Sequence, residues 1–213
     1  MKDTDVVFRC GKLSLEGVLS IPDGSGIFPA VIVCHPHPLY GGSMDNNVVF
    51  SLCQALTQAS FISFRFNFRG VGRSEGDFGH GISEQEDVES AVSFVTTVKQ
   101  VDSSRIGVAG YSAGAVFALP VGVRDRRIKA LAAISPPFSM SDFQFLKVCP
   151  KPKLLISGSA DAFVPESQFT ELYRNLAEPK DYDIIEGADH SWWGYELSLV
   201  KKITSFFTTA LRR

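Results

Sequence analysis

The chain has 213 residues, of which 45% are hydrophobic and 21% charged, and its formal net charge is −2. This length fits one α/β domain, residues 1–213, and the near-neutral charge offers no basic field for a nucleic-acid partner. The first residues are polar and no apolar run approaches membrane-spanning length, so we expect a cytoplasmic protein that does not insert into a membrane.

The first elements predicted along the chain are strands. Residues 6–10 and 12–21 alternate apolar and polar side chains around Gly11, which predicts an antiparallel pair at one edge of a sheet. Residues 29–34 form a continuous apolar run, typical of a parallel strand that is covered on both faces. Next follow a predicted helix over 46–59 and a predicted strand over 61–66.

The loop after the 29–34 strand, residues 35–42, reads HPHPLYGG. Because proline has no N–H, a main-chain donor in this turn must be His37 or a residue from Leu39 onward, and we favour His37. Tyr40 is a candidate for contact with a ligand. The histidines at 35 and 37 could form a metal pair, but no carboxylate or third histidine stands at a ligand spacing nearby. We therefore expect neither a metal nor another cofactor.

The loop after the 61–66 strand, residues 67–76, reads NFRGVGRSEG and is rich in glycine, but it lacks the lysine and the spacing of a P-loop. Arg69 and Arg73 could hold a phosphate there. The interpretation we favour is a structural connection in which Arg69 forms hydrogen bonds to neighbouring loops. Further along, Ser83 and Glu86 match a capping box, which predicts that a helix begins at Ser83.

Residues 110–114 read GYSAG and stand between a predicted strand over 105–109 and a predicted helix. Strand, Gly-x-Ser-x-Gly and helix together are the pattern of a nucleophile elbow, in which a sharp turn lifts the serine above the end of a sheet. Glycines at both ends of the motif leave room for the neighbouring strand and helix. The turn also aims the N–H of Ala113 toward a reacting carbonyl oxygen. Ser112 is therefore the candidate nucleophile.

The rest of the chain continues the alternation of strands and helices. After an initial hairpin, this alternation predicts a mostly parallel twisted sheet with helices on both faces. Ligands of such sheets bind at the carboxyl ends of the strands, where Ser112 is placed. The remaining predicted strands are 129–135, 153–157 and 182–186, and the remaining predicted helices are 165–176 and 197–211.

A serine nucleophile needs a base and an acid that orients the base. His190, the one histidine after Ser112, lies in the loop after the last predicted strand and is the candidate base. Asp161 follows the 153–157 strand and is the candidate acid. Asp142 is the main alternative, and Asp189 is less suitable because adjacent residues rarely face each other. The predicted triad is Ser112, Asp161 and His190.

The segment 136–152 is too short for a separate lid domain. It either forms a short helix, capped by Ser141, that packs on the body of the protein, or provides an apolar wall for the site, and the sequence leaves both possibilities open. The four cysteines, which have no C-x-x-C spacing, are expected to be buried free thiols. Together with Tyr40, the candidate substrate contacts are Phe138, Phe143, Trp192 and Trp193.

From residue 28 onward the chain resembles the α/β-hydrolase superfamily, in its His35-Pro36 turn, its 69–74 loop and its Ser112 elbow with Asp161 and His190 behind it. The segments 35–46 (HPHPLYGGSMDN) and 67–72 (NFRGVG) are similar to a group of small hydrolases related to dienelactone hydrolase and described as predicted esterases. Dienelactone hydrolases proper use a cysteine nucleophile, whereas residue 112 is serine. The resemblance therefore implies an α/β-hydrolase fold and favours ester hydrolysis over lactone opening.

These observations lead to one functional hypothesis and two alternatives. We expect a serine hydrolase that cleaves small-molecule carboxylic esters or thioesters of small to medium acyl groups, with the N–H groups of Ala113 and His37 as the oxyanion hole. The alternatives are a non-catalytic binding module on the same fold, and a peptidase or acyltransferase that uses the same triad. The sequence predicts no oligomeric state.

Overall fold

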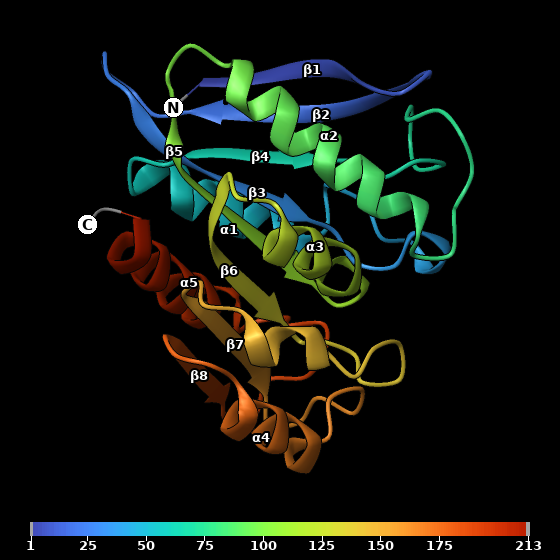
Figure 1. Ribbon diagram of the computed structural model, residues 1–213, viewed down its shortest axis with the longest axis vertical. Coiled ribbons are helices and arrows are strands. Elements are labelled where there is room, and N and C mark those ends of the chain that lie inside the picture. The colour runs from blue at the N-terminus through green and yellow to red at the C-terminus, as the bar shows by residue number, and fades with distance from the viewer. Residues whose placement is uncertain (1, 212–213) are drawn as a thin grey trace.

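An eight-stranded sheet lies at the centre of the computed structural model, which describes residues 2–211 (Figure 1). Its strands are β1 (Lys2–Cys10), β2 (Leu13–Ile21), β3 (Phe28–Cys34), β4 (Ile62–Phe66), β5 (Val101–Tyr111), β6 (Ile128–Ile134), β7 (Lys153–Gly158) and β8 (Lys180–Ile185). Their order across the sheet is β1-β2-β4-β3-β5-β6-β7-β8. β1 and β2 are antiparallel, as are β2 and β4, and the other neighbours are parallel. The predicted edge hairpin and mostly parallel sheet are confirmed.

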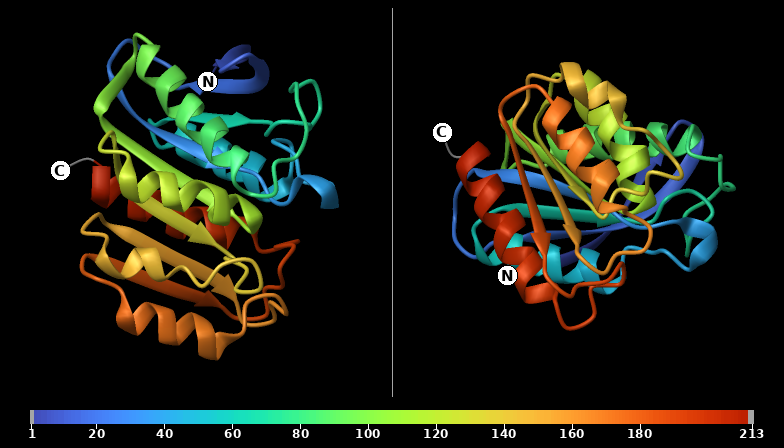
Figure 2. Two further views of the ribbon diagram at one scale, coloured as in Figure 1. Left: turned by 45° about the vertical axis from the view of Figure 1, so that its right-hand side comes forward. Right: turned by 90° about the horizontal axis from the view of Figure 1, so that it is seen from below.

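Helices cover both faces of the sheet, as predicted (Figure 2). They are α1 (Asn47–Gln58), α2 (Ser83–Thr97), α3 (Ala113–Arg124), α4 (Glu166–Asn175) and α5 (Glu196–Leu211). One face packs against α1 and α5, and the other against α2, α3 and α4. Two short 3₁₀ helices, Pro38–Tyr40 and Gln144–Val148, lie in the connections.

The strands bury alternate side chains on the two faces, as the period of two residues in a strand requires. In β3, Ile32 packs with the α2–α3 side, whereas Val31 and Val33 pack with the α1–α5 side. All three side chains are fully buried, which explains why this strand reads as a continuous apolar run. The four cysteines are buried and free, as expected. Within residues 2–211, no helix is both long and apolar enough to cross a bilayer.

The helix α2 begins at Ser83, as predicted, but its capping differs from the prediction. The residue before it is Ile82, and no side chain caps the helix there. The carboxylate of Glu84 instead accepts the N–H groups of Gly79 and Gly81, at 2.6 and 2.7 Å. The capping-box prediction from Ser83 and Glu86 is wrong, because the neighbouring Glu84 is buried and holds the incoming loop directly.

Candidate active site

The carboxyl ends of β5, β7 and β8 bring Ser112, Asp161 and His190 together. Nε2 of His190 lies 2.9 Å from Oγ of Ser112, and Nδ1 lies 2.9 Å from the nearer carboxylate oxygen of Asp161. Because an ionised carboxylate can only accept, Nδ1 carries the proton and Nε2 is free to accept the serine hydroxyl. The three side chains, which the sequence places in separate loops, therefore form one chain of hydrogen bonds.

The environment of Asp161 keeps this acid ionised. Burial alone would raise its pKa, but the hydrogen bonds from His190 and Ser135 outweigh that effect and hold the pKa of Asp161 below its ordinary value. The N–H of Phe163 also donates to the carboxylate, at 3.0 Å. At neutral pH a negative charge thus lies behind the imidazole, where it stabilises the protonated ring.

The backbone around Ser112 explains both glycines of the motif. Ser112 has φ 54° and ψ −125°, and its N–H donates to the carbonyl of Ile134 at 2.8 Å. A Cβ at Gly110 would lie 2.5 Å from Cα of Ala115, and a Cβ at Gly114 would lie 2.4 Å from the carbonyl oxygen of Cys34. Only glycine lets the turn close against α3 on one side and against the end of β3 on the other.

The same close approach places the 35–42 loop beside the first turn of α3. Ala113 is the first residue of that helix, and the first N–H groups of a helix have no acceptor within it. The carbonyl of His37 accepts the N–H groups of Tyr40 and Gly42, at 3.1 and 3.0 Å, which closes the loop into a tight turn. The oxyanion hole from Ala113 and His37 stays a prediction.

His35, considered above as a possible metal ligand and as part of the His35-Pro36 turn, is fully buried and uses both ring nitrogens within the protein. Nδ1 donates to the carbonyl of Pro36 at 2.7 Å, and Nε2 accepts the N–H of Phe68 at 3.1 Å. The ring therefore joins the 35–42 loop to the 67–76 loop. Burial lowers the pKa of His35 to about 4, so the ring is neutral at physiological pH.

We expect this histidine to make stability depend on pH. In the unfolded chain the pKa of His35 is near 6.5, whereas in the folded protein it is about 4. As pH falls, the unfolded state therefore binds the proton first, so the stabilisation is complete above pH 6.5 and is lost between 6.5 and 4. The loss amounts to about 3 kcal/mol, and it can be measured by denaturant unfolding across this range.

Two variants isolate that contribution. His35→Asn should flatten the dependence of unfolding free energy on pH in this window, apart from the contribution of carboxylates. His80→Asn, which alters an exposed histidine, should keep the wild-type slope. Equal slopes in wild type and His35→Asn would contradict the assignment.

The 67–76 loop is a structural connection, as favoured from the sequence. Arg69 is largely buried and contacts both carboxylate oxygens of Asp87, with the closest approach at 2.7 Å, and also Glu86 at 3.1 Å. Arg73 binds Glu16 at 2.7 Å. Because carboxylates engage both guanidinium groups, this arrangement favours the structural connection over the phosphate cradle considered as the alternative.

Two of the predicted substrate contacts are wrong. Phe143 and Trp192 are fully buried in the core, and the indole N–H of Trp192 donates to Oγ of Ser135 at 3.0 Å. Both residues have positive φ angles, 53° and 61°, in loops that border the site. Of the others, Phe138 is half-buried, whereas Tyr40 and Trp193 are 86% and 70% exposed.

The structure adds two contacts of His190 that the sequence did not indicate. The ring of Phe163 is 60% exposed and its centroid lies 4.7 Å from that of His190. The hydroxyl of Tyr111, at the end of β5, donates to the His190 carbonyl. The position of Phe163, two residues after the candidate acid in the same loop, is the signal that could have identified it.

The alternative acids do not reach the imidazole. Asp142 is exposed and accepts the N–H of Gln144 at 3.0 Å. One carboxylate oxygen of Asp189 accepts the N–H groups of Ser191 and Trp192, at 2.9 and 3.1 Å, and therefore shapes the turn that carries His190. Asp161 is the carboxylate that this geometry pairs with the ring.

The sequence is similar to a family of hydrolases and to several bacterial proteins. Residues 30–151 match the family described as serine aminopeptidase, S33. An uncharacterized protein of Rickettsia prowazekii is 36% identical over 170 residues, covering 76% of this chain and 71% of that protein. Matches to several longer bacterial relatives cover 41–43% of those proteins.

Solved structures extend the similarity to the whole fold. A protein of unknown function from Agrobacterium tumefaciens, described as a candidate α/β hydrolase, superposes with a TM-score of 0.89 at 33% identity and covers 98% of this chain and 97% of its own. A protein from Xanthomonas campestris, described as an α/β serine hydrolase without a lid, has a TM-score of 0.88 at 26% identity, with coverage of 100% and 97%.

Proposed function

The chain belongs to the hydrolase family described as serine aminopeptidase, S33, and from this premise we propose that it hydrolyses carboxylic esters or thioesters of small to medium acyl groups. The observation that carries the proposal is the hydrogen-bonded chain from Ser112 through His190 to Asp161. That arrangement is competent for acyl transfer through a covalent intermediate, and it needs no cofactor.

The proposed reaction has two halves. Oγ of Ser112 attacks the carbonyl carbon while Nε2 of His190 takes its proton, and the N–H groups of Ala113 and His37 donate to the oxyanion. The C–O or C–S bond then breaks, and the proton passes from His190 to the departing oxygen or sulfur. In the second half His190 deprotonates a water molecule, which attacks the acyl carbon and releases the carboxylic acid and Ser112.

The side chains at the site support a substrate with a short apolar acyl group. The histidine side chain is 22% exposed, and the rings of Phe163 and Tyr40 contact His190 and His37, with centroids at 4.7 and 4.6 Å. These rings can cover a few methylene groups. The 136–152 segment packs Phe143 and Leu146 into the core, which leaves little of it to enclose a long chain.

We expect kcat/KM to rise from acetyl to butyryl or hexanoyl esters and then to fall. Each fully buried methylene contributes about 0.8 kcal/mol, or about fourfold in rate, until the rings are covered. A chain-length series of p-nitrophenyl esters and thioesters measures this, with amino-acid p-nitroanilides to test the peptidase alternative. A rate that rises steadily to palmitoyl esters, or increases sharply at an oil–water interface, would contradict the proposal, and preference for the anilides would favour the peptidase.

Asp161→Asn should lower the rate by about 10²–10⁴-fold on the same esters, because an amide can present its NH₂ to Nδ1 and favour the wrong tautomer of His190. The matched control is Asp142→Asn, which should change the rate little because Asp142 is exposed and its carboxylate accepts a hydrogen bond within its own turn. Steady-state kinetics on p-nitrophenyl butyrate distinguish them. The reverse ranking would assign the acid to the loop after β6.

A further inference from the structure

Charge is unevenly placed around the proposed site. The loops that follow the parallel strands contain seven Asp or Glu side chains, two arginines and no lysine. The exposed Lys12 lies at the same edge, in the turn between β1 and β2, on the far side of β4 from β3 and β5. Both arginines are held by carboxylates, Arg69 by Asp87 and Glu86 and Arg73 by Glu16. The nearest lysine in sequence, Lys147, is half-buried in a groove that it shares with Asp142 and Glu171. These loops are residues 35–46, 67–82, 135–143, 159–165 and 186–195.

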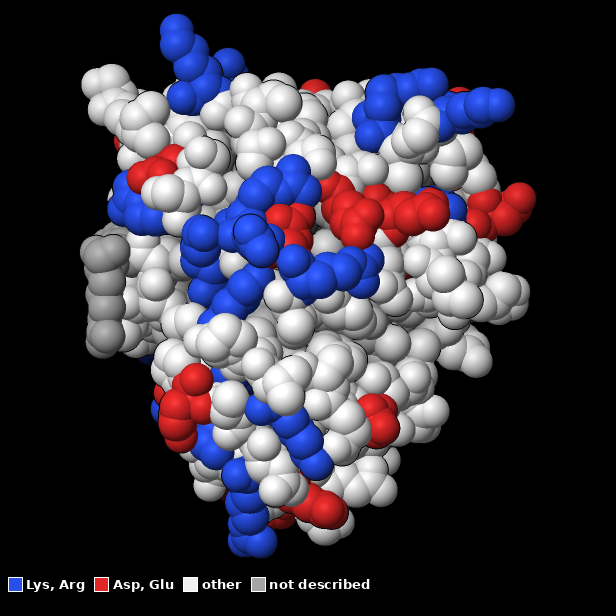
Figure 3. Space-filling model, in the orientation of Figure 1, with Lys and Arg blue, Asp and Glu red and all other residues white. Residues whose placement is uncertain are grey.

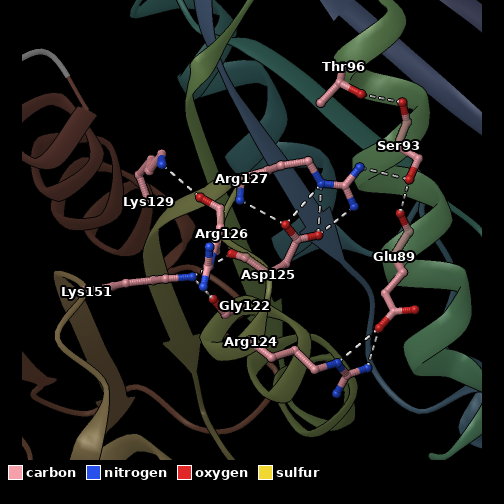
Figure 4. Close-up of polar contacts among 10 residues, drawn as sticks. All are labelled: Glu89, Ser93, Thr96, Gly122, Arg124, Asp125, Arg126, Arg127, Lys129 and Lys151. Carbon is pink, nitrogen blue, oxygen red and sulfur yellow. Dashed lines mark hydrogen bonds and ion pairs between the residues drawn. The ribbon is translucent and has the colours of Figure 1, made fainter.

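Many of the cations lie at the other end of the strands. Lys and Arg side chains gather on the face where α3 ends and β6 begins (Figure 3). Most of them bind their own neighbours there: Lys151 donates to the carbonyls of Gly122 and Asp125, both at 2.6 Å (Figure 4). Arg124 pairs with Glu89, also at 2.6 Å. These cations stabilise the end of α3 and are remote from Ser112.

The same carboxyl-edge loops expose large apolar side chains. Tyr40 contacts His37 and Phe163 contacts His190, as described above. The edge therefore presents apolar surface and carboxylates around the reacting atoms, and no unpaired arginine within its described loops. The exposed apolar residues are Leu39, Tyr40, Ile82, Met140, Phe163 and Trp193.

We infer that the substrate is apolar and carries no negative charge near the scissile bond, so that coenzyme A thioesters and other phosphate-bearing esters are excluded from efficient turnover. This inference rests on the proposed ester or thioester hydrolysis. Sites that bind phosphate groups supply arginine, lysine or a metal ion at short range. Here the carboxylates of Asp161, behind the His190 ring, and of Asp189, next to His190 in the chain, are both ionised at neutral pH and would repel an anionic leaving group at low salt.

A series of butyryl thioesters that differ in the charge of the leaving group tests the inference. The probes are butyryl-coenzyme A, the neutral N-acetylcysteamine thioester and the cationic thiocholine thioester. A parallel series uses 4-sulfophenyl, 4-acetylphenyl and 3-trimethylammoniophenyl butyrate, so that charge is compared within whichever class is hydrolysed. At low salt, kcat/KM for the neutral probe should exceed that for the anionic probe by about tenfold or more. Added salt should reduce this ratio of kcat/KM values.

Variants at Tyr40 test the same inference from the side of the protein. Tyr40→Lys places a cation beside His37, and Tyr40→Gln removes the same ring without adding charge. The ratio of anionic to neutral turnover should rise severalfold in the lysine variant relative to the glutamine variant. Wild-type turnover of the anionic probes that equals or exceeds that of the neutral ones would overturn the inference. Absence of any Ser112-dependent turnover in both series would instead overturn the proposed function.

Discussion

Ser112→Ala is expected to lower kcat/KM for an activated ester by about 10⁴-fold or more, while the protein stays folded. The loss is large because attack by the hydroxyl and proton transfer to His190 are a single event, and removing Oγ leaves only binding and oxyanion stabilisation. The assay is p-nitrophenyl butyrate hydrolysis, with the thermal unfolding midpoint as the test of folding.

Labelling by a fluorophosphonate probe gives an independent result. The wild-type protein should be labelled at Ser112, and the alanine variant should not. Ser198→Ala, which alters an exposed serine of α5, is the matched control and should keep both activity and labelling. Near-full activity in Ser112→Ala would show that the elbow is not the nucleophile, and an unlabelled wild-type protein would favour the binding module.

His190→Ala should lose activity about as completely as Ser112→Ala, and the double variant should be little worse than either single one. Nucleophile and base act as a unit, as the 2.9 Å contact between Nε2 and Oγ requires, so their effects cannot add. The measurement is kcat/KM for the three variants on one ester.

His80→Ala is the control for the loss of a histidine. His80 is exposed, and Phe78 is its ring contact, with centroids 5.3 Å apart. Its replacement should leave the rate close to that of the wild type. An essential His80 together with a dispensable His190 would disprove the assignment of the base.

The fold and the hydrogen-bonded triad were accessible from the sequence because their signals are local. Gly110 is required by a contact with the backbone of α3 and Gly114 by a contact with the end of β3, so the motif predicts the turn. His190 and Asp161 follow buried strands, and parallel strands end at the same edge of the sheet. Chain order and strand direction were therefore enough to bring three distant residues together.

The surroundings of the triad depend on information that sequence patterns do not contain. Phe143 and Trp192 stand in loops that border the site, but both side chains are fully buried in the core. The contact of Phe163 with His190 spans 27 positions and depends on how two loops fold over each other. At the start of α2, Ser83 and Glu86 matched the capping-box pattern, but the buried carboxylate of Glu84 holds the preceding loop through the N–H groups of Gly79 and Gly81. The predictions that failed depended on where a side chain points, whereas those that were confirmed depended on the type and order of the strands and helices.

The backbone at Ser112 places function in conflict with stability. A φ of 54° with a ψ of −125° is a conformation that glycine adopts freely and that costs other residues about 1–3 kcal/mol. The contacts of Gly110 and Gly114 and the hydrogen bond to Ile134 hold the residue there. Selection for stability alone would place glycine at this position. The protein therefore remains below the thermodynamic optimum of its own fold for as long as a hydroxyl is needed at the tip of the turn.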